Sequence, residues 1–335
     1  MRRIVLGLIF LAVSITLIVS CLVIFGTAKP PKPLSSVTNP FATMNYSGLP
    51  PIERYRMRDG AELSFRYYPA RSKQVAVLIH GSAGSSSDMH AMAQALQASG
   101  VAVYVPDLRG HGANYPHGDV VYTGQLDDDM ADFLHVVQPR HPDAKWTLIG
   151  FSSGGGFALR VAAEPIGRRF DRYILLSPFL RYDARTVRRS APSPDNPKVQ
   201  KEQAWSTTST GRILGLLVLD EVGIHRFDGL PVIHFAVPPN IPSVTANYSW
   251  RMQQSFQPHN DFRADIRSVS KPMWVFVGEN DQLFLPEKFQ EVFDAERKDI
   301  PVTILHGLGH SDMATSAEAI RVVVATFEKN GMGHL

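Results

Sequence analysis

The sequence predicts an α/β fold in which helices cover both faces of a mostly parallel sheet. From residue 75 to residue 329, short apolar runs with the character of buried strands alternate with segments of helical periodicity. This alternation is typical of parallel sheets, because the crossover between two parallel strands passes through a helix. Several apolar runs end in glycine-rich or polar turns. Ligands of such folds bind beyond the carboxyl ends of the strands, so we expect the functional residues in those turns.

Composition and charge are those of an ordinary globular protein. The 335 residues include 44% hydrophobic and 19% charged residues, and the formal net charge is +3. This small charge gives no support to nucleic-acid binding. Cys21 is the only cysteine, so no intramolecular disulfide is possible, and no CxxC or HExxH spacing indicates a metal site. We expect no cofactor.

The N-terminus carries an apolar segment, residues 4–25, that holds no charged residue and is long enough for a helix to cross a bilayer. It is long for the hydrophobic region of a cleaved signal. We therefore interpret residues 1–26 as an uncleaved membrane anchor, with the rest of the chain facing away from the cytoplasm. The alternatives are a cleaved export signal, a lipoprotein processed at Cys21 in "IVSC", and a buried core helix.

The body is expected to begin with a linker and a hairpin. Residues 27–51 are rich in proline, which favours a semi-extended spacer rather than a packed element. Two alternating runs around "DGA" then predict paired strands. The further strands are expected at residues 75–80, 101–107, 146–150, 173–178, 273–278 and 302–305, and the helices at 88–98, 126–137, 155–163, 286–295 and 314–329.

A long interruption divides the alternating pattern. We expect the core in two parts, residues 52–178 and 272–330, separated by residues 179–271. A connection of this length without structure of its own would be unusual in a compact domain. We interpret residues 179–271 as an inserted cap or lid.

The stretch "GFSSG" at residues 150–154 fits the pattern G-x-S-x-G with Ser152 at its centre. Centring the pattern on Ser153 would put Phe151 at the first glycine position. A nucleophile elbow needs small neighbours because its turn is sharp, and it lies between a strand and a helix, as this stretch does. We predict that Ser152 is a nucleophile rather than part of a glycine-rich connector.

A serine nucleophile needs a base, and the base needs a carboxylate that orients it. His310 lies between the last strand and the last helix, whereas His306 ends the strand and is interpreted as structural. Asp281 follows the strand at 273–278, with Glu279 as a nearby rival. Either carboxylate could instead cap the following turn. We predict His310 as the base and Asp281 as its partner.

Stabilisation of an oxyanion requires backbone N–H groups aimed at the developing charge. One is expected from Ser153, which follows the nucleophile. The other is expected from Ser82 in "HGSAGSS", the loop after the first long strand.

Taken together, these motifs resemble those of the α/β-hydrolases, and specifically the branch of serine aminopeptidases, monoacylglycerol lipases and lysophospholipases. The matching stretches are "LIHGSAG", "VPDLRGHG", "GFSSGG", "VGENDQLF" and "GLGHSDM", and the order Ser, Asp, His is that of α/β-hydrolases. The resemblance implies an α/β-hydrolase fold, catalysis without a cofactor, a cap that selects the substrate, and structural roles for Asp107, Arg109 and His111.

We therefore predict a serine hydrolase that cleaves carboxylic esters through an acyl-enzyme on Ser152. An apolar cap segment at residues 213–222, beside a membrane anchor, fits monoacylglycerol or lysophospholipid substrates, although it could simply pack the cap on the core. Four arginines could meet an anionic head group or only face solvent: Arg181, Arg185, Arg188 and Arg189. The alternatives are a peptidase or amidase with the same triad, for which no amine-binding site is identified, and a catalytically silent, membrane-tethered binding protein.

Overall fold

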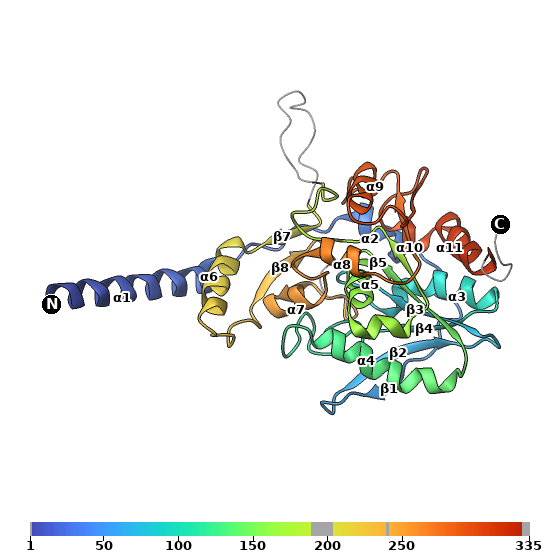
Figure 1. Cartoon of the computed structure of the whole chain (residues 1–335), viewed down its shortest axis with the longest axis horizontal. Coiled ribbons are helices and arrows are strands. Elements are labelled where there is room, and N and C mark those ends of the chain that lie inside the picture. Colours follow the sequence, from blue (N-terminus) through green and yellow to red (C-terminus); the bar gives the residue numbers. More distant parts are fainter. Residues whose placement is uncertain (1, 189–203, 239–240, 330–335) are drawn as a thin grey trace, which may run out of the picture.

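The computed structural model describes residues 2–188, 204–238 and 241–329 (Figure 1). Its centre is an eight-stranded sheet in the order β1-β2-β4-β3-β5-β6-β10-β11. The pairs β1–β2 and β2–β4 are antiparallel, and all other neighbours are parallel. The prediction of a mostly parallel sheet is confirmed. Its strands are β1 Glu53–Arg56, β2 Glu62–Tyr68, β3 Gln74–Ile79, β4 Ala102–Pro106, β5 Lys145–Phe151, β6 Arg172–Leu176, β10 Met273–Gly278 and β11 Val302–Leu305.

Helices cover both faces of this sheet, which explains why its strands read as continuous apolar runs. Along β3, Val75 and Val77 pack into one core and Ala76 and Leu78 into the other, because side chains of a strand alternate between its faces. One face is covered by α4 Gln125–Val137, α5 Ser153–Ala163, α8 Phe262–Ser268 and α9 Glu287–Asp294, and the other by α3 His90–Ala98, α10 Asp312–Thr315 and α11 Ala317–Lys329. Short 3₁₀ turns lie at Ser86–Met89, Gln138–Arg140 and Pro165–Arg169.

The helix predicted at 314–329 is interrupted. Ser316, between α10 and α11, has extended backbone angles, and its hydroxyl accepts the N–H of Ala319 over 3.2 Å. Serine stabilises a helix N-terminus in this way. The periodicity of the segment could not show this break, because both helices contribute apolar side chains to the same core.

The insertion predicted as a cap has a small sheet of its own. Its strands are β7 Ser206–Thr208, β8 Pro231–Phe235 and β9 Asn247–Ser249, which pair antiparallel in that order. The helices α6 Thr210–Glu221 and α7 Trp250–Ser255 accompany it. Helix α8, at the end of the predicted insertion, packs on the core instead, so below the name cap is used for the part with β7 to β9, α6 and α7. The proline-rich "APSPDNP" lies outside the described residues.

The segment predicted as an unpacked spacer contains a packed helix, α2 Ser35–Ala42. Val37 is 4% exposed, and its carbonyl accepts the hydroxyl of Ser311 over 2.7 Å. Phe41, one turn later, packs on Phe151 with ring centroids 6.1 Å apart. The spacer interpretation was wrong for this stretch, because Val37 and Phe41 place an apolar face against the core.

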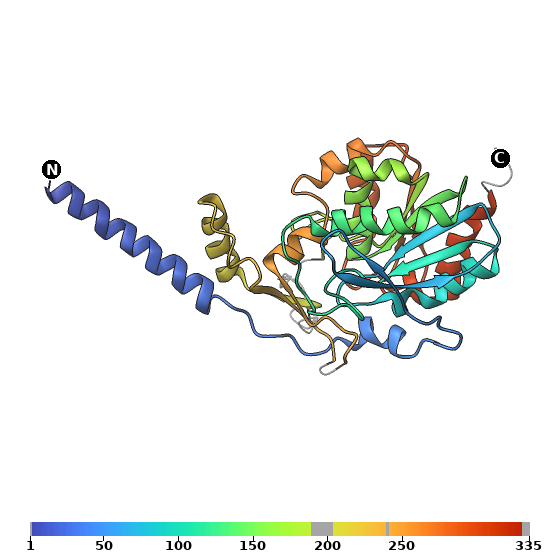
Figure 2. The same ribbon diagram turned by 90° about the horizontal axis from the view of Figure 1, so that it is seen from below.

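Helix α1 Arg2–Phe25 projects from the globular part, as Figure 2 shows. Among the described residues it is the single helix that is long and apolar enough to cross a membrane. Most of its side chains are exposed, but Val19 and Val23 near its end pack against α6. The predicted apolar helix is confirmed, and its exposure excludes a buried core helix.

Candidate active site

Ser152 lies at the sharp turn between β5 and α5. Its backbone angles are φ 55° and ψ −119°, a region that residues other than glycine rarely adopt. The N–H of Ser152 donates to the carbonyl of Leu176 over 2.9 Å, and its own carbonyl accepts the N–H groups of Gly156 and Phe179. These bonds hold the strained turn in place, and such strain persists only where the surroundings fix it.

The two glycines of the pattern are required by close backbone contacts. A Cβ atom on Gly150 would lie 2.1 Å from the carbonyl oxygen of Gly154. A Cβ atom on Gly154 would lie 2.3 Å from the carbonyl oxygen of His80. Larger residues would push α5 away from the sheet, so the local sequence of a nucleophile elbow has a direct steric cause here.

Three of the residues predicted from the sequence lie in one hydrogen-bonded series. Nε2 of His310 is 3.0 Å from Oγ of Ser152, and Nδ1 of His310 is 2.8 Å from Oδ2 of Asp281. Ser152, His310 and Asp281 are 5%, 2% and 1% exposed. They follow β5, β11 and β10, so the carboxyl ends of three parallel strands bring them together. This geometry allows a proton to pass from the serine hydroxyl to the imidazole.

The second oxygen of Asp281 is fixed by the backbone. Oδ1 accepts the N–H groups of Leu283 and Phe284, each over 2.9 Å. Burial alone would raise the pKa of Asp281, but the charge and hydrogen bond of His310 and the two backbone N–H groups lower it below its ordinary value. The carboxylate is therefore ionised and oriented toward His310.

The rival carboxylate Glu279 points elsewhere. Oε1 of Glu279 is 3.2 Å from Nδ1 of His306, and both side chains are largely exposed. A hydrogen bond from the N–H of Gly307, together with His306, lowers the pKa of Glu279. Glu279 and His306 thus form a surface pair that caps the turn after β11, and neither has a hydrogen bond to His310 among the described residues.

The loop after β3 lies against the Ser152 turn. The hydroxyls of Ser82 and Ser153 are 3.0 Å apart. The N–H of Ser153 opens α5, where it has no acceptor inside the helix, and that of Ser82 donates to no protein acceptor in the described ranges. Neither amide therefore has a protein acceptor among the described residues, and that of Ser153 lies at the positive end of the α5 dipole.

Two residues of the cap form hydrogen bonds with the loop after β3. The phenolic oxygen of Tyr248 in β9 accepts the N–H of Ala83 over 3.0 Å and lies 2.6 Å from Nε2 of His111. The N–H of Thr245 donates to the carbonyl of Ala83. Ala83 has a φ of 62°, so these bonds stabilise a conformation that alanine rarely adopts. No local sequence signal marks Tyr248, because its partners lie in other parts of the chain.

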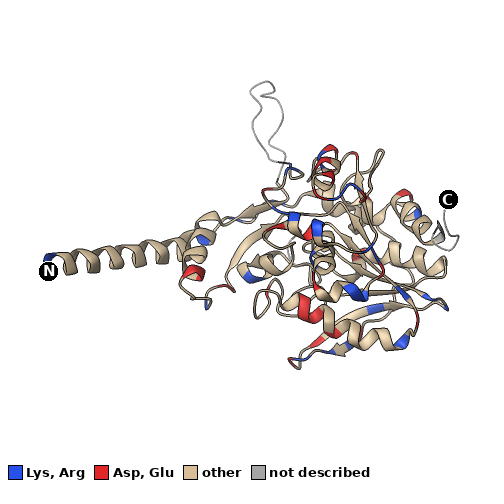
Figure 3. Ribbon diagram, viewed as in Figure 1, with Lys and Arg blue, Asp and Glu red and all other residues tan. Residues whose placement is uncertain are grey.

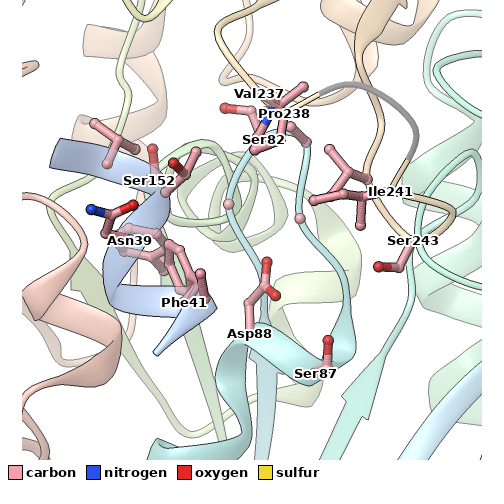
Figure 4. Close-up of a pocket in the computed structure, with 18 of the residues that line it drawn as sticks. Asn39, Phe41, Ser82, Ser87, Asp88, Ser152, Val237, Pro238, Ile241 and Ser243 are labelled. Atoms are coloured by element: carbon pink, nitrogen blue, oxygen red, sulfur yellow. The ribbon is translucent and has the colours of Figure 1, made fainter. Parts of the chain in front are cut away.

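Ser152 and His310 open into a pocket of about 380 Å³ between the core, the cap and α2 (Figure 4). The pocket wall is mainly apolar, which suits an aliphatic chain. Its apolar side chains come from Val37, Phe41, Phe151, Trp205, Val237, Ile241, Val244 and Leu283, and its polar ones include Asn39, Ser87, Asp88 and Ser243.

Part of the chain is similar in sequence to known hydrolases. Residues 70–213 match the family described as serine aminopeptidase, S33. The sn-1-specific diacylglycerol lipase ABHD11 of Xenopus tropicalis is 36% identical over 89 residues, 26% of this chain and 26% of that protein. The monoacylglycerol lipase of Mycolicibacterium smegmatis is 33% identical over 93 residues, 27% of this chain and 32% of that protein. These matches span about a quarter to a third of the curated relatives.

Structural comparison covers far more of the chain. A soluble variant of the monoglyceride lipase of Saccharomyces cerevisiae, in complex with a substrate analogue, superposes over 84% of this chain and 95% of its own, with a TM-score of 0.63 and 16% identity. The chain has the α/β-hydrolase fold. A membrane phospholipase A, described as a bacterial virulence factor, matches this α/β-hydrolase fold over 99% of the chain and all of its own, with a TM-score of 0.57 and 16% identity.

One polar side chain in the pocket was missed by sequence reasoning. Burial raises the pKa of Asp88 to about 7, and nearby Asp107 acts in the same direction, although hydrogen bonds from Ser85 and Ser87 oppose them. The hydrogen bond from Ser85 joins its backbone N–H to Oδ2 of Asp88 over 3.2 Å. In the sequence, Asp88 has the position of an ordinary helix-capping residue, and only the tertiary structure places it at the pocket.

The arginines considered for an anionic head group are engaged with the protein. Arg188 donates to the carbonyls of Asp281 and Phe284, Arg185 pairs with Glu291, and Arg181 pairs with Asp183. Arg189 lies outside the described residues. Arg188 thus braces the turn that carries Asp281, which is a structural role within the hydrolase fold.

Among the described residues, one group could hold a metal ion: Asp220, His225 and Asp228 in the cap. Nδ1 of His225 lies 3.1 Å from a carboxylate oxygen of Asp220 and 3.3 Å from one of Asp228. None of the three lines the pocket, so no step at Ser152 involves them.

Proposed function

We propose that the protein is a serine hydrolase that cleaves carboxylic esters through an acyl-enzyme on Ser152. The observation that carries this proposal is the buried series from Asp281 through His310 to Ser152 at the wall of an apolar pocket. The family match and the lipase-like relatives support a lipase- or esterase-like hydrolase.

In the first half of the reaction, Oγ of Ser152 bonds to the ester carbonyl carbon while Nε2 of His310 takes the hydroxyl proton. The tetrahedral oxyanion accepts hydrogen bonds from the N–H groups of Ser82 and Ser153. When it collapses, the ester C–O bond breaks and His310 gives its proton to the leaving alcohol. Asp281 stabilises the imidazolium form of His310 and holds Nδ1 as a donor.

In the second half, water attacks the acyl-enzyme while His310 again accepts a proton. The second oxyanion collapses, the bond between the acyl carbon and Oγ of Ser152 breaks, and the proton returns from His310 to Ser152. The carboxylic acid leaves. Every proton transfer uses His310, so no residue outside the series is required to move a proton.

The pocket supports a lipid-like ester as substrate. Phe41, Phe151 and Leu283 line the same pocket as Ser152, and burial of an acyl chain against them is favourable by about 0.8 kcal/mol per CH₂ group. The relatives that are lipases of diacylglycerol and monoacylglycerol favour the same class. We therefore propose monoacylglycerol or lysophospholipid-type substrates.

A peptidase or amidase is the second candidate, and one observation favours it. The carboxyl of Asp88 lines the pocket, and a substrate ammonium bound there would be paired with a charge. The match to a serine aminopeptidase family points the same way. Against this, the pKa of Asp88 is about 7, so the carboxyl is only partly ionised at neutral pH without a ligand.

We propose that α1 anchors the protein in a membrane, with the catalytic part outside the cytoplasm. Cleaved export and lipidation at Cys21 are the alternatives. Cys21 is exposed on α1, and the helix continues for another turn after it. Mass spectrometry of the mature protein decides among the three: an intact N-terminus supports the anchor, whereas a new N-terminus or a lipid on Cys21 contradicts it.

A serine-directed fluorophosphonate probe and a panel of esters test the catalytic proposal. We expect the wild type to be labelled, and we expect p-nitrophenyl esters of increasing acyl length to be cleaved faster than aminoacyl anilides. Faster cleavage of anilides would favour the peptidase. Folded wild-type protein that takes no label would support the catalytically silent binding protein instead.

A further inference from the structure

Exposed apolar side chains form a strip along the outer face of the cap helix α6. Leu214, Leu217 and Val218 are spaced three and four residues apart, so they share one face of the helix. Val222 and Ile224 continue the strip just beyond its end. All five are between 40% and 66% exposed. We call these five residues the α6 strip.

The opposite face of α6 is bound to the end of α1. Leu216 is fully buried and packs with Val19 and Val23 of α1. A Cβ atom on Gly215 would lie 2.7 Å from Cγ2 of Val23, so only glycine allows this close approach. Figures 1 and 2 both show α6 beside the point where α1 joins the globular part.

Hydrogen bonds fix this contact. Arg212 of α6 donates from Nε to the carbonyl of Val23 over 2.9 Å and from Nη2 to that of Ile24 over 3.3 Å. Its backbone N–H donates to the carbonyl of Gly26 over 3.0 Å. The last carbonyls of a helix have no partner inside it, and a cation near them is favourable. The position of α6 relative to α1 is therefore set by both packing and polar contacts.

The length of α1 determines at which depth of a bilayer its contact with α6 would lie. Its 24 residues span about 36 Å, slightly more than the hydrocarbon thickness of about 30 Å. Figure 3 shows no charged residue along α1 between its N-terminal arginines and α6. The last two turns of α1, where α6 packs, then reach the boundary between acyl chains and head groups.

We propose that the α6 strip inserts into the interfacial layer of the membrane that α1 spans, so that the cap is docked on the lipid surface at a second point. This inference rests on the proposed anchor. The occupant is lipid, because the strip is apolar and exposed, and α6 packs on the end of α1, at the level where that helix would leave the bilayer. Apolar helix faces lie about 5–10 Å deep in this layer.

The docking would bring the pocket close to the source of a lipid substrate. Helix α6 leads into β8, and Val237 and Ile241, which follow β8, line the pocket. Helix α2, which follows α1, forms another part of the wall. An ester leaving the bilayer would then reach Ser152 between two segments that are both attached to the end of α1.

A fluorescent reporter on the full-length chain tests the docking. In a Cys21→Ser background, Val218→Cys carries an environment-sensitive fluorophore, and Arg321→Cys on α11 is the control. Arg321 has an exposed side chain, and α11 lies far from α1 in both views. A third sample carries the fluorophore on the native Cys21. Each is reconstituted in phosphatidylcholine–phosphatidylglycerol vesicles with or without brominated acyl chains.

We expect brominated lipid to quench the emission at positions 218 and 21 at least twofold and to leave position 321 unchanged. Quenching at 21 without quenching at 218 would overturn the docking and leave the anchor intact. No quenching at either position would overturn both. A concentration-dependent blue shift at 218 in detergent, without quenching in vesicles, would assign the strip to a second copy of the chain.

A functional comparison separates docking from catalysis. The double variant Leu217→Asp with Val218→Asp is expected to cleave vesicle-borne monoacylglycerol at least fivefold more slowly and a soluble butyrate ester within twofold of wild type. Equal rates on vesicles would contradict the docking. Loss of both rates in a folded variant would also contradict the docking. An inactive wild type would contradict only the proposed hydrolase activity, since the quenching result is independent of catalysis.

Discussion

The backbone N–H of Ala83, on the loop after β3, donates to the phenolic oxygen of Tyr248 in the cap, across 165 residues of sequence. The next residue toward the N-terminus, Ser82, is a proposed oxyanion donor. The phenol also hydrogen-bonds His111 on the loop after β4. One cap side chain thus joins two core loops, and the position of the cap becomes a determinant of the proposed oxyanion site.

This contact predicts a catalytic effect of Tyr248→Phe. The change leaves the buried N–H of Ala83 without its acceptor, at a cost of about 1–3 kcal/mol. We expect kcat for a soluble ester to fall about tenfold, with KM within about twofold, because an oxyanion donor acts in the transition state. Tyr173→Phe is the control, since Tyr173 is equally buried and donates to Gly167 instead. Equal losses of kcat in both variants would show that Tyr248 only stabilises the fold and does not position the oxyanion donor.

The two adjacent serines are predicted to differ. Ser152→Ala should lower kcat by at least about 10⁴-fold and abolish fluorophosphonate labelling, because the nucleophile is lost. Ser153→Ala keeps the backbone N–H and loses only the 3.0 Å contact with Ser82, so its kcat should fall less than about tenfold. Comparable losses in the two variants would contradict the assignment.

The carboxylate assignment is tested by a pair of amide substitutions. Asp281→Asn should lower kcat about 10³- to 10⁴-fold, because it would favour the wrong tautomer of His310. Glu279→Gln should keep kcat within about twofold of wild type, since Glu279 pairs with an exposed His306 and surface pairs of this kind contribute little to stability. The reverse ranking in ester hydrolysis would show that Glu279 is the functional partner.

Asp88 predicts a specific pH dependence of stability. Its pKa is raised to about 7 in the folded protein, whereas an unfolded chain has the ordinary value of about 3.8. Between these values the folded state holds a proton that the unfolded state has lost, so stability falls as the pH rises, by at most about 1.4 kcal/mol per pH unit. Asp88→Asn removes this contribution. Thermal unfolding of both proteins is measured from pH 4 to pH 8. As the pH rises, the stability of the variant should increase relative to that of the wild type. Parallel curves of stability against pH would refute the raised pKa.

The pocket wall formed by α2 predicts a change in acyl-chain preference. Phe41→Ala removes an apolar contact beside Phe151. We expect kcat/KM for decanoate esters to fall about five- to tenfold, while that for acetate stays within about twofold. The ratio of the two rates within one protein is the measurement, so it is independent of the amount of folded enzyme. An unchanged ratio would place the acyl chain elsewhere.

The sequence was informative wherever a short stretch determines its own structure. The parallel sheet follows from apolar runs that are buried on both faces, and the elbow follows from glycines that only a tight turn requires. Because the candidate residues follow strands, the fold itself gathers Ser152, Asp281 and His310 at one edge. Their catalytic roles stay a prediction.

The remaining features depend on partners far along the chain. Val37 of α2 is held by Ser311, which lies 274 residues away, and α2 contains Pro40 in a helix of only eight residues. Such a short helix is unstable alone and forms through tertiary packing, so local propensity cannot predict it. Tyr248 and Asp88 were missed for the same reason, because each acquires its role from loops that only the folded chain brings near.

The packing of α2 decides how a soluble form of the protein should be made. Removing everything before Glu53, where the first strand begins, would delete Val37, Asn39 and Phe41 and open one side of the pocket. Starting the chain near Lys29 would remove α1 yet keep that wall, with the N–H of Leu34 still bound to the carbonyl of Ala236. A shortened protein that is inactive could therefore have lost its substrate site rather than its attachment to lipid.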